Sequence, residues 1–232
     1  MDIRAFDLPR YLRVLPLFSH LSPAETERLA LGCQLRRFAR GEAIFHMGEP
    51  CEEFHVAVTG QVKLYAVSPA GQEKVVEIVG PGGSFAEALM FTGQSYIINA
   101  QSLSDTLLLS VKKAAVVAEI ERDPRLAMRM LAGLSRRLHG LVQDVQGYAL
   151  HSGVQRVIGY LLRGVSTDDS VGSEAITVSL PVSKSVVASR LSLTPEYFSR
   201  VLHELEAAGL IEIDKRDIVI RDARRLARYP SD

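Results

Sequence analysis

Glu196, Ser199 and Arg200 lie on one stripe of a predicted helix, and His203 continues that stripe. Their i, i+3, i+4 and i+7 spacing places them on a single helix face. A guanidinium can donate two parallel hydrogen bonds to guanine N7 and O6, a carboxylate can accept one from a base amine, and a hydroxyl can bond a base or a phosphate. These groups therefore fit recognition of base edges in DNA. The alternative is a solvent-facing Glu196–Arg200 salt pair, worth about 0.2–0.5 kcal/mol.

The segment that carries these residues has the signals of a helix-turn-helix. Thr194 is a predicted N-cap, Pro195 fits the first helical position, and Gly209 fits the end. An apolar-periodic helix precedes it, joined by a tight turn at residues 192–193. In this motif the second helix enters the major groove and its N-terminal residues meet base edges. Besides the stripe, the residues expected to contact DNA are Thr194, Ser183 and Lys184.

Composition limits the other classes of protein. The chain has 232 residues, is 47% hydrophobic and 23% charged, and carries 27 basic and 27 acidic residues. It contains no apolar run of transmembrane length and no signal-peptide pattern at its start, so we expect a cytoplasmic protein without a membrane partner. From His151 onward there are 11 basic and 11 acidic residues. A general basic surface is absent, so DNA recognition would depend on a few placed side chains.

The stretch from Leu35 to Val111 reads as short strands separated by turn residues, which is typical of an all-β barrel or sandwich. A capped helix over residues 22–34 precedes it. A short helix over residues 112–123 and a long one over residues 124–150 follow it. The long helix repeats apolar residues in heptads, which favours a parallel dimer seam over packing within its own domain. The predicted seam consists of Ala127, Leu131, Leu134, Leu138, Leu141, Val145 and Tyr148.

Three regions follow from this pattern. We expect an α+β protein with a β-roll sensor domain and N-terminal helix over residues 1–123, a dimerisation helix over 124–150, and a DNA-binding domain over 151–232. Two short strands around Lys215-Arg216 make the last region a winged helix-turn-helix.

The residues 194–200, Thr-Pro-Glu-Tyr-Phe-Ser-Arg, resemble the E-x-x-S-R recognition helix of the Crp/Fnr superfamily of bacterial transcription regulators. The order of elements also resembles that family over essentially the whole chain. The resemblance implies that Glu196, Ser199 and Arg200 contact bases and that RNA polymerase is a partner. The three together are similar to the Fnr branch, which implies an inverted repeat such as TTGAT-NNNN-ATCAA. A homodimer would match such a palindrome.

The sensor region lacks two ligand signatures known in that family. Members that respond to cyclic AMP hold its phosphate with an arginine that follows a Gly-Glu pair. Here Glu87 is present, but Gln94-Ser95 stands where Arg-Ser is expected, and no Lys, Arg or His occurs between Val75 and Val111. A phosphate site without a cation would be weak, so the sequence disfavours a cyclic nucleotide. No cysteine precedes Cys33, so an N-terminal iron–sulfur cluster is not expected either.

Residues 71–91 resemble the Dnr/NnrR branch, whose members regulate denitrification. That resemblance implies nitric oxide as the signal and haem as the cofactor. A haem needs apolar walls and an axial ligand, often histidine. The predicted effector pocket consists of Phe85, Ala86, Glu87, Leu89, Met90, Tyr96 and Ile98.

The candidate haem ligands are His139 and His55, and His20 and His46 are further candidates. His139 lies on the long helix where the branch also carries a histidine. His55 lies in a strand, on the face opposite Phe54. One departure is Arg190, which stands where the Dnr branch carries a histidine proposed as an axial ligand.

Two alternatives stay open. The β-roll could respond to a cyclic nucleotide or another small effector, or act without one. An enzyme is the other class, but no catalytic grouping, phosphate loop or metal-ligand spacing supports it.

Overall fold

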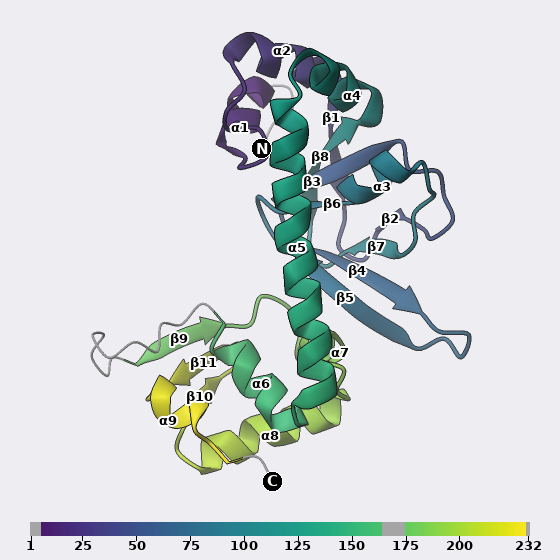
Figure 1. Cartoon of the computed structure of the whole chain (residues 1–232). Coiled ribbons are helices and arrows are strands. Elements are labelled where there is room, and N and C mark those ends of the chain that lie inside the picture. Colours follow the sequence, from purple (N-terminus) through teal and green to yellow (C-terminus); the bar gives the residue numbers. More distant parts are fainter. Residues whose placement is uncertain (1–5, 164–174, 231–232) are drawn as a thin grey trace. The chain divides into compact units, whose positions relative to one another are not determined.

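The computed structural model of the chain describes residues 6–163 and 175–230 (Figure 1). The chain forms two compact units, one ending at His139 and one beginning at Gly140. Helix α5 (Arg125–Leu150) contributes residues to both units. Within the described residues, no helix is long and apolar enough to cross a membrane.

The first unit is built on two four-stranded antiparallel sheets, ordered β1-β8-β3-β6 and β2-β7-β4-β5. The apolar run at residues 107–109 belongs to a central strand that is buried on both faces. Such burial explains why its hydrophobic residues are continuous rather than alternating. The strands are β1 (Cys33–Phe38), β2 (Ala43–Phe45), β3 (Glu53–Thr59), β4 (Val62–Val67), β5 (Glu73–Val79), β6 (Ser84–Phe85), β7 (Asn99–Ser102) and β8 (Thr106–Lys112).

Strand β3 separates two hydrophobic cores because its side chains alternate between faces. Phe54 and Val56 enter a core shared with α1 (Leu8–Val14), α2 (Pro23–Leu31), α4 (Lys113–Arg122) and the first turns of α5. Ala57, next along the strand, enters the core between the two sheets. Figure 1 shows α1, α2 and α4 together at one end of the sheets.

The segment after β5 is more structured than its sequence indicates. It forms β6 and then a short helix, α3 (Glu87–Thr92). Ala86, between them, adopts a left-handed conformation with φ of 68°. Neither α3 nor α1 is predicted by the pattern, because each is short and weakly periodic.

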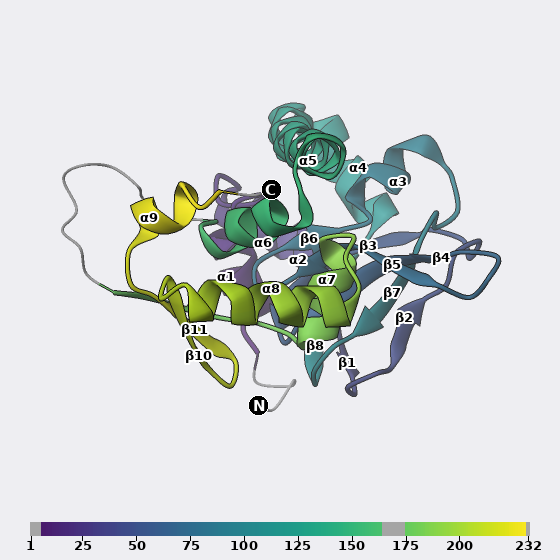
Figure 2. The ribbon, with the colours of Figure 1, turned by 90° about the horizontal axis from the view of Figure 1, so that it is seen from below.

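The second unit is a winged helix-turn-helix. Figure 2 shows α7 at one end of α8 and strands β10 and β11 at the other. Together with β9 these two strands form a three-stranded antiparallel sheet in the order β10-β11-β9. The elements are α6 (Gly153–Leu161), β9 (Ile176–Ser179), α7 (Lys184–Arg190), α8 (Pro195–Ala207), β10 (Ile211–Asp214), β11 (Asp217–Ile220) and α9 (Ala223–Ala227).

Candidate nucleic-acid interface and sensor site

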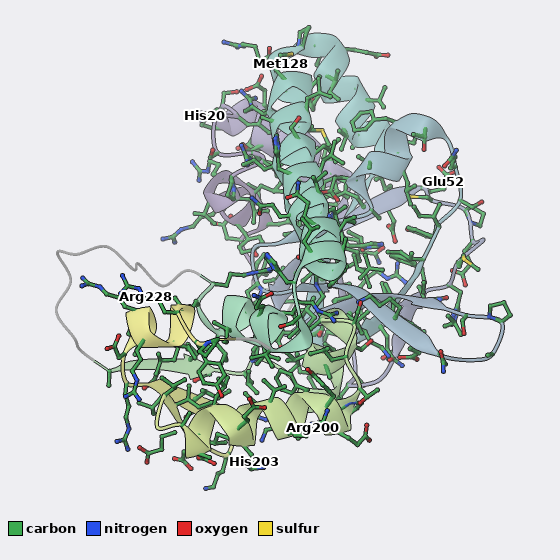
Figure 3. The ribbon with its side chains drawn as sticks, turned by 60° about the horizontal axis from the view of Figure 1, so that its bottom comes forward. His20, Glu52, Met128, Arg200, His203 and Arg228 are labelled. Atoms are coloured by element: carbon green, nitrogen blue, oxygen red, sulfur yellow. The ribbon has the colours of Figure 1, made fainter. Side chains whose placement is uncertain are left out.

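Helix α8 has one buried face and one exposed face, as its periodicity predicts. The buried face consists of Phe198, Val201, Leu202 and Leu205, each at most 1% exposed. Glu196, Arg200 and His203 are exposed on the opposite side, and Ser199 is half-buried. Figure 3 shows Arg200 and His203 on the outer side of α8. The core therefore fixes the rotation of the helix and leaves the polar stripe outside.

The ends of α8 confirm the predicted capping signals. The hydroxyl of Thr194 accepts a hydrogen bond from the backbone N–H of Tyr197 at 3.2 Å, and Pro195 occupies the first turn. Gly209, beyond the last turn, has a φ of 68°, a conformation that side chains other than glycine rarely adopt. Thr194, one of the predicted DNA contacts, thus has a structural role at the helix start.

The proposed base-contacting groups are not engaged with one another. Among the described residues no ion pair joins Glu196 to Arg200, so the surface salt pair is not formed. The Arg200 guanidinium lies over the ring of Tyr197, 4.8 Å from its centroid. His203 Nδ1 lies 3.4 Å from a carboxylate oxygen of Glu206. Arg200 and Glu196 thus keep their polar atoms available for a partner.

A side chain of α6 forms hydrogen bonds to the turn between α7 and α8. Ser192 has a positive φ of 57° and Leu193 is half-buried. Arg156 donates hydrogen bonds to the carbonyl oxygens of Leu191 at 2.7 Å and Ser192 at 3.2 Å. At the start of α7, Ser183 is the exposed N-cap residue and Lys184 is half-buried.

The end of α5 is bonded to α7 by a half-buried polar cluster that the sequence does not reveal. The Tyr148 hydroxyl donates to the carbonyl of Arg190 at 2.5 Å and accepts from its guanidinium at 2.6 Å. The same guanidinium pairs with Asp144, which also lies 3.3 Å from Arg163. Burial raises the pKa of Tyr148. Tyr148, placed on the seam by heptad counting, therefore turns partly toward α7.

Most of the rest of the predicted seam is exposed, although Ala127 is half-buried. Leu131 is 55% exposed, Leu138 62% and Val145 63%, while Leu141 is 37% exposed and Leu134 is half-buried. A stripe of large exposed apolar side chains on a long helix is typical of an interaction surface.

In the first unit, Arg137 from α5 supplies the cation that the sensor segment lacks. Its guanidinium lies 2.5 Å from a Glu77 oxygen and 3.2 Å from a Glu87 oxygen, and it donates to the Ser84 carbonyl at 3.3 Å. The Ser84 hydroxyl donates to Glu87 at 3.1 Å. One arginine is thus shared by two carboxylates, which we call the Arg137 cluster.

The predicted apolar pocket beside this cluster is mostly packed. Phe85 and Tyr96 belong to the core between the sheets, and Met90 belongs to the core under the helices. Each of the three is at most 5% exposed. Half-buried Ala86, Leu89 and Ile98 pack against these cores or lie at their edge. The residues predicted to surround an effector therefore stabilise the fold in this arrangement.

His55 is enclosed by the same aromatic core. Its Nδ1 lies 2.9 Å from the Ser110 hydroxyl and its Nε2 lies 3.4 Å from the Tyr96 hydroxyl. The ring is 1% exposed and stacks on Phe45, with centroids 5.8 Å apart. Burial lowers the pKa of His55 to about 3, so the ring is neutral.

A haem does not fit the described residues as they are arranged. Both nitrogens of His55 have partners, and the apolar side chains around it leave the ring 1% exposed. His139 is exposed on α5, with Nδ1 3.1 Å from the carbonyl oxygen of Ser135. The exposed His20 and His46 are likewise outside the two cores. Among the described residues, His55 is thus held inside the packed core, and the other three candidate histidines lie outside both cores.

Comparisons with known proteins agree with this geometry. The cyclic nucleotide-binding domain family matches residues 35–123, and the Crp-like helix-turn-helix domain family matches residues 155–229. The crystal structure of DNR from Pseudomonas aeruginosa is 34% identical, covers 94% of this chain and 95% of its own, and has a TM-score of 0.51.

Two further proteins show the breadth of the similarity. The CRP-like cAMP-activated global transcriptional regulator of Mycobacterium tuberculosis is 24% identical over 91% of this chain and 95% of its own. FixK2 from Bradyrhizobium japonicum shares the fold, with a TM-score of 0.73, 23% identity, and coverage of 86% of this chain and 98% of its own. These matches confirm the predicted architecture of β-roll, long helix and helix-turn-helix.

Proposed function

The chain belongs to the Crp/Fnr family of DNA-binding transcription regulators, and we propose that it reads an inverted repeat as a homodimer through Glu196, Ser199 and Arg200. Its relatives are transcription regulators, which confirms the expectation that the chain is not an enzyme. A bacterial transcription regulator must reach the chromosome, so we propose that the protein is cytoplasmic. RNA polymerase is the further partner that we propose.

The observation that carries the proposed recognition of bases is that Arg200 is exposed and has no carboxylate partner among the described residues. This side chain lies on the outer face of a capped second helix. Such a guanidinium can donate both hydrogen bonds to a guanine, and Glu196 can accept from a cytosine or adenine amine. A TTGAT-like half-site offers these bases.

The exposed seam of α5 supports the homodimer. Two copies joined along Leu131, Leu138 and Val145 would bury side chains that are each at least 55% exposed in a single chain. A two-fold dimer presents two identical recognition helices, which matches a palindrome whose half-sites are about 34 Å apart.

Arg200→Ala tests the proposal. We expect the variant to stay folded and dimeric but to lose about 10- to 100-fold of its preference for a TTGAT half-site over one with the G·C pair replaced. Fluorescence anisotropy on the two duplexes at one salt concentration measures this. Arg225→Ala, which removes an exposed arginine from α9, is the matched control and should keep the preference. An unchanged preference in Arg200→Ala would contradict the proposal.

For the signal, the resemblance of residues 71–91 to the Dnr/NnrR branch favours nitric oxide. Because the packed core around His55 does not fit a haem, we derive no step through that group. An absorption spectrum of the protein after incubation with haem, with and without nitric oxide, tests this candidate. Stoichiometric binding and a Soret shift would support it, and the absence of both would remove it.

A cyclic nucleotide is the alternative signal, since one relative is named as cAMP-activated. Here the arginine nearest Glu87 is already shared by two carboxylates, so a phosphate would have to break the Arg137 cluster to gain a cation. We therefore expect no measurable heat on calorimetric titration with cyclic AMP at micromolar concentrations. Saturable binding in that titration would restore the cyclic-nucleotide interpretation.

A further inference from the structure

Tyr197, on the first turn of α8, packs against the backbone of Gly153 at the start of α6. A methyl group added to Gly153 would lie 2.4 Å from Cε1 of the Tyr197 ring and 2.8 Å from both Cζ and the hydroxyl oxygen. Carbon atoms do not approach so closely, so only glycine leaves room for the ring. The start of α6 is itself well defined, because Ser152 and Gln155 form a reciprocal capping box.

The same ring supports the guanidinium of Arg200, 4.8 Å from the ring centroid. A cation over an aromatic face is attracted by the ring's quadrupole. Stacking also leaves the edge of the planar guanidinium free, and the N–H groups that guanine needs lie on that edge. Beside the stack is a cavity of about 310 Å³ lined in part by Tyr197, Arg200 and Glu204. Without the ring, the guanidinium would have this open space to move into.

We infer that Tyr197 is a positioning residue that orders Arg200 for guanine, and that Gly153 is the position that admits its ring. This inference rests on the proposed reading of DNA by Arg200. A side chain that is already ordered loses less conformational entropy on binding, so the ring strengthens specific binding without touching a base. Gly153 also follows the end of α5 closely, at Leu150. A movement of the start of α6 would therefore displace the Tyr197 ring and, with it, the guanidinium of Arg200.

Tyr197→Leu removes the aromatic face while keeping an apolar side chain against Gly153. We expect the affinity for a TTGAT palindrome to fall about two- to fivefold, the range of one exposed cation–π contact. Affinity for unrelated DNA should not change, because that binding depends on phosphates. Tyr197→Phe keeps the ring and should bind like the natural protein. A role in stability alone would instead lower specific and nonspecific binding together, or lower only the unfolding midpoint.

Gly153→Ala changes the other partner of the contact between Tyr197 and Gly153. We expect the same loss of specific affinity, because the methyl group displaces the ring. Gly159→Ala is the matched control on the same helix, since a methyl group there meets no atom within 4 Å. In the double variant Gly153→Ala/Tyr197→Leu the two losses should not add, because the ring that the methyl group displaces is already gone. Additive losses, or a harmless Gly153→Ala, would overturn the inference.

Arg200→Ala separates this inference from the function on which it rests. If Arg200→Ala leaves base preference unchanged, the proposed reading of DNA fails. If Arg200→Ala removes the preference while Tyr197→Leu keeps full specific affinity, only the positioning role of Tyr197 fails.

Discussion

Arg200 on α8 and Arg137 on α5 are the same side chain in opposite surroundings. Arg137 is 26% exposed and shared by Glu77 and Glu87, which lie on two elements of the first unit. Arg200 is exposed, rests on an aromatic ring and pairs with no carboxylate of the described chain. Arg137, which stabilises the fold, is thus surrounded by its counter-charges, whereas Arg200, which we propose contacts DNA, is kept apart from carboxylates.

This difference separates the two candidate sites. Glu196 and Arg200 on the exposed face of α8 offer an acceptor and donors to a ligand without breaking an ion pair of the described residues. The sensor site offers almost none, because its arginine, its carboxylates and its histidine already have partners. A ligand at the sensor site must therefore compete with the fold. Such competition is one way in which binding can shift the protein between two conformations.

The largest expected effect concerns the exposed apolar side chains of α5. Like Arg200, they are exposed, and we propose that they contact a partner. Leu138→Glu or Val145→Glu places a charge on the exposed seam of α5 and should convert the dimer to a monomer. Affinity for the palindrome should fall about 100-fold or more, because the two half-sites are then no longer bound by one linked molecule. Sedimentation and anisotropy measure the two effects.

Gln143→Glu is the control for the seam, since it adds the same charge to another exposed position of α5. It should leave both dimer and affinity unchanged. A seam variant that stays dimeric and keeps full affinity would show that the subunits meet elsewhere.

The second effect contrasts the two arginines directly. Arg137→Met leaves Glu87, whose side chain is 9% exposed, without its cation. We expect the free energy of unfolding to fall by about 1–3 kcal/mol, because a buried charge loses its partner. The preference for the TTGAT half-site should remain, the reverse of the result expected for Arg200→Ala. Urea unfolding and anisotropy provide the two measurements.

Two further variants sharpen that contrast. Arg136→Met, at the exposed neighbouring position, should leave stability unchanged. Arg137→Met/Glu87→Gln should recover part of the lost stability, since the unpaired charge is removed as well. Equal stability of Arg137→Met and the natural protein would show that the Arg137 cluster does not support the fold.

The third effect concerns the buried histidine. Burial lowers the pKa of His55 from about 6.5 to about 3, so below pH 6.5 the unfolded chain binds a proton that the folded chain does not. The contribution of His55 to the free energy of unfolding is therefore complete well above pH 6.5 and is lost as the pH falls through 6.5 toward 3. Between pH 7.5 and pH 5 the loss should be about 2 kcal/mol. Urea unfolding at pH 7.5 and pH 5 measures it.

His55→Phe/Ser110→Ala should flatten that pH dependence. The second change is needed because the Ser110 hydroxyl would otherwise lose its partner inside the core. His139→Gln, at an exposed site, should retain the full slope. The same slope in the double variant would assign the effect to another group.

The sequence predicts the geometry of α8 better than that of the candidate sensor site, because the interactions that shape α8 join residues close together in the chain. The cap at Thr194, the end at Gly209 and the two faces of α8 all depend on residues within about four positions of one another. Local periodicity contains that information. The role of Arg137 depends on residues 50 and 60 positions away, which no spacing rule connects.

Tyr148 shows the same limit within one helix. The heptad pattern identifies an apolar stripe but does not say which neighbour covers each position. The structure places the Tyr148 hydroxyl on Arg190, 42 positions later. His55 is a related case, because its alternation in β3 correctly predicts a face opposite Phe54 but not the aromatic side chains that close over it.

The smallest expected effect concerns the N-cap of α8. It tests whether the preference for a half-site persists when the start of this helix is destabilised. Thr194→Ala removes the hydroxyl that accepts from the N–H of Tyr197, and the loss of an N-cap costs about 1 kcal/mol of stability. Thr194→Ser restores an equivalent acceptor and should recover that stability. Because the buried face of α8 still fixes its rotation, half-site preference should persist in Thr194→Ala. A lost preference at unchanged stability would instead mean that Thr194 contacts DNA directly and that the cap is secondary.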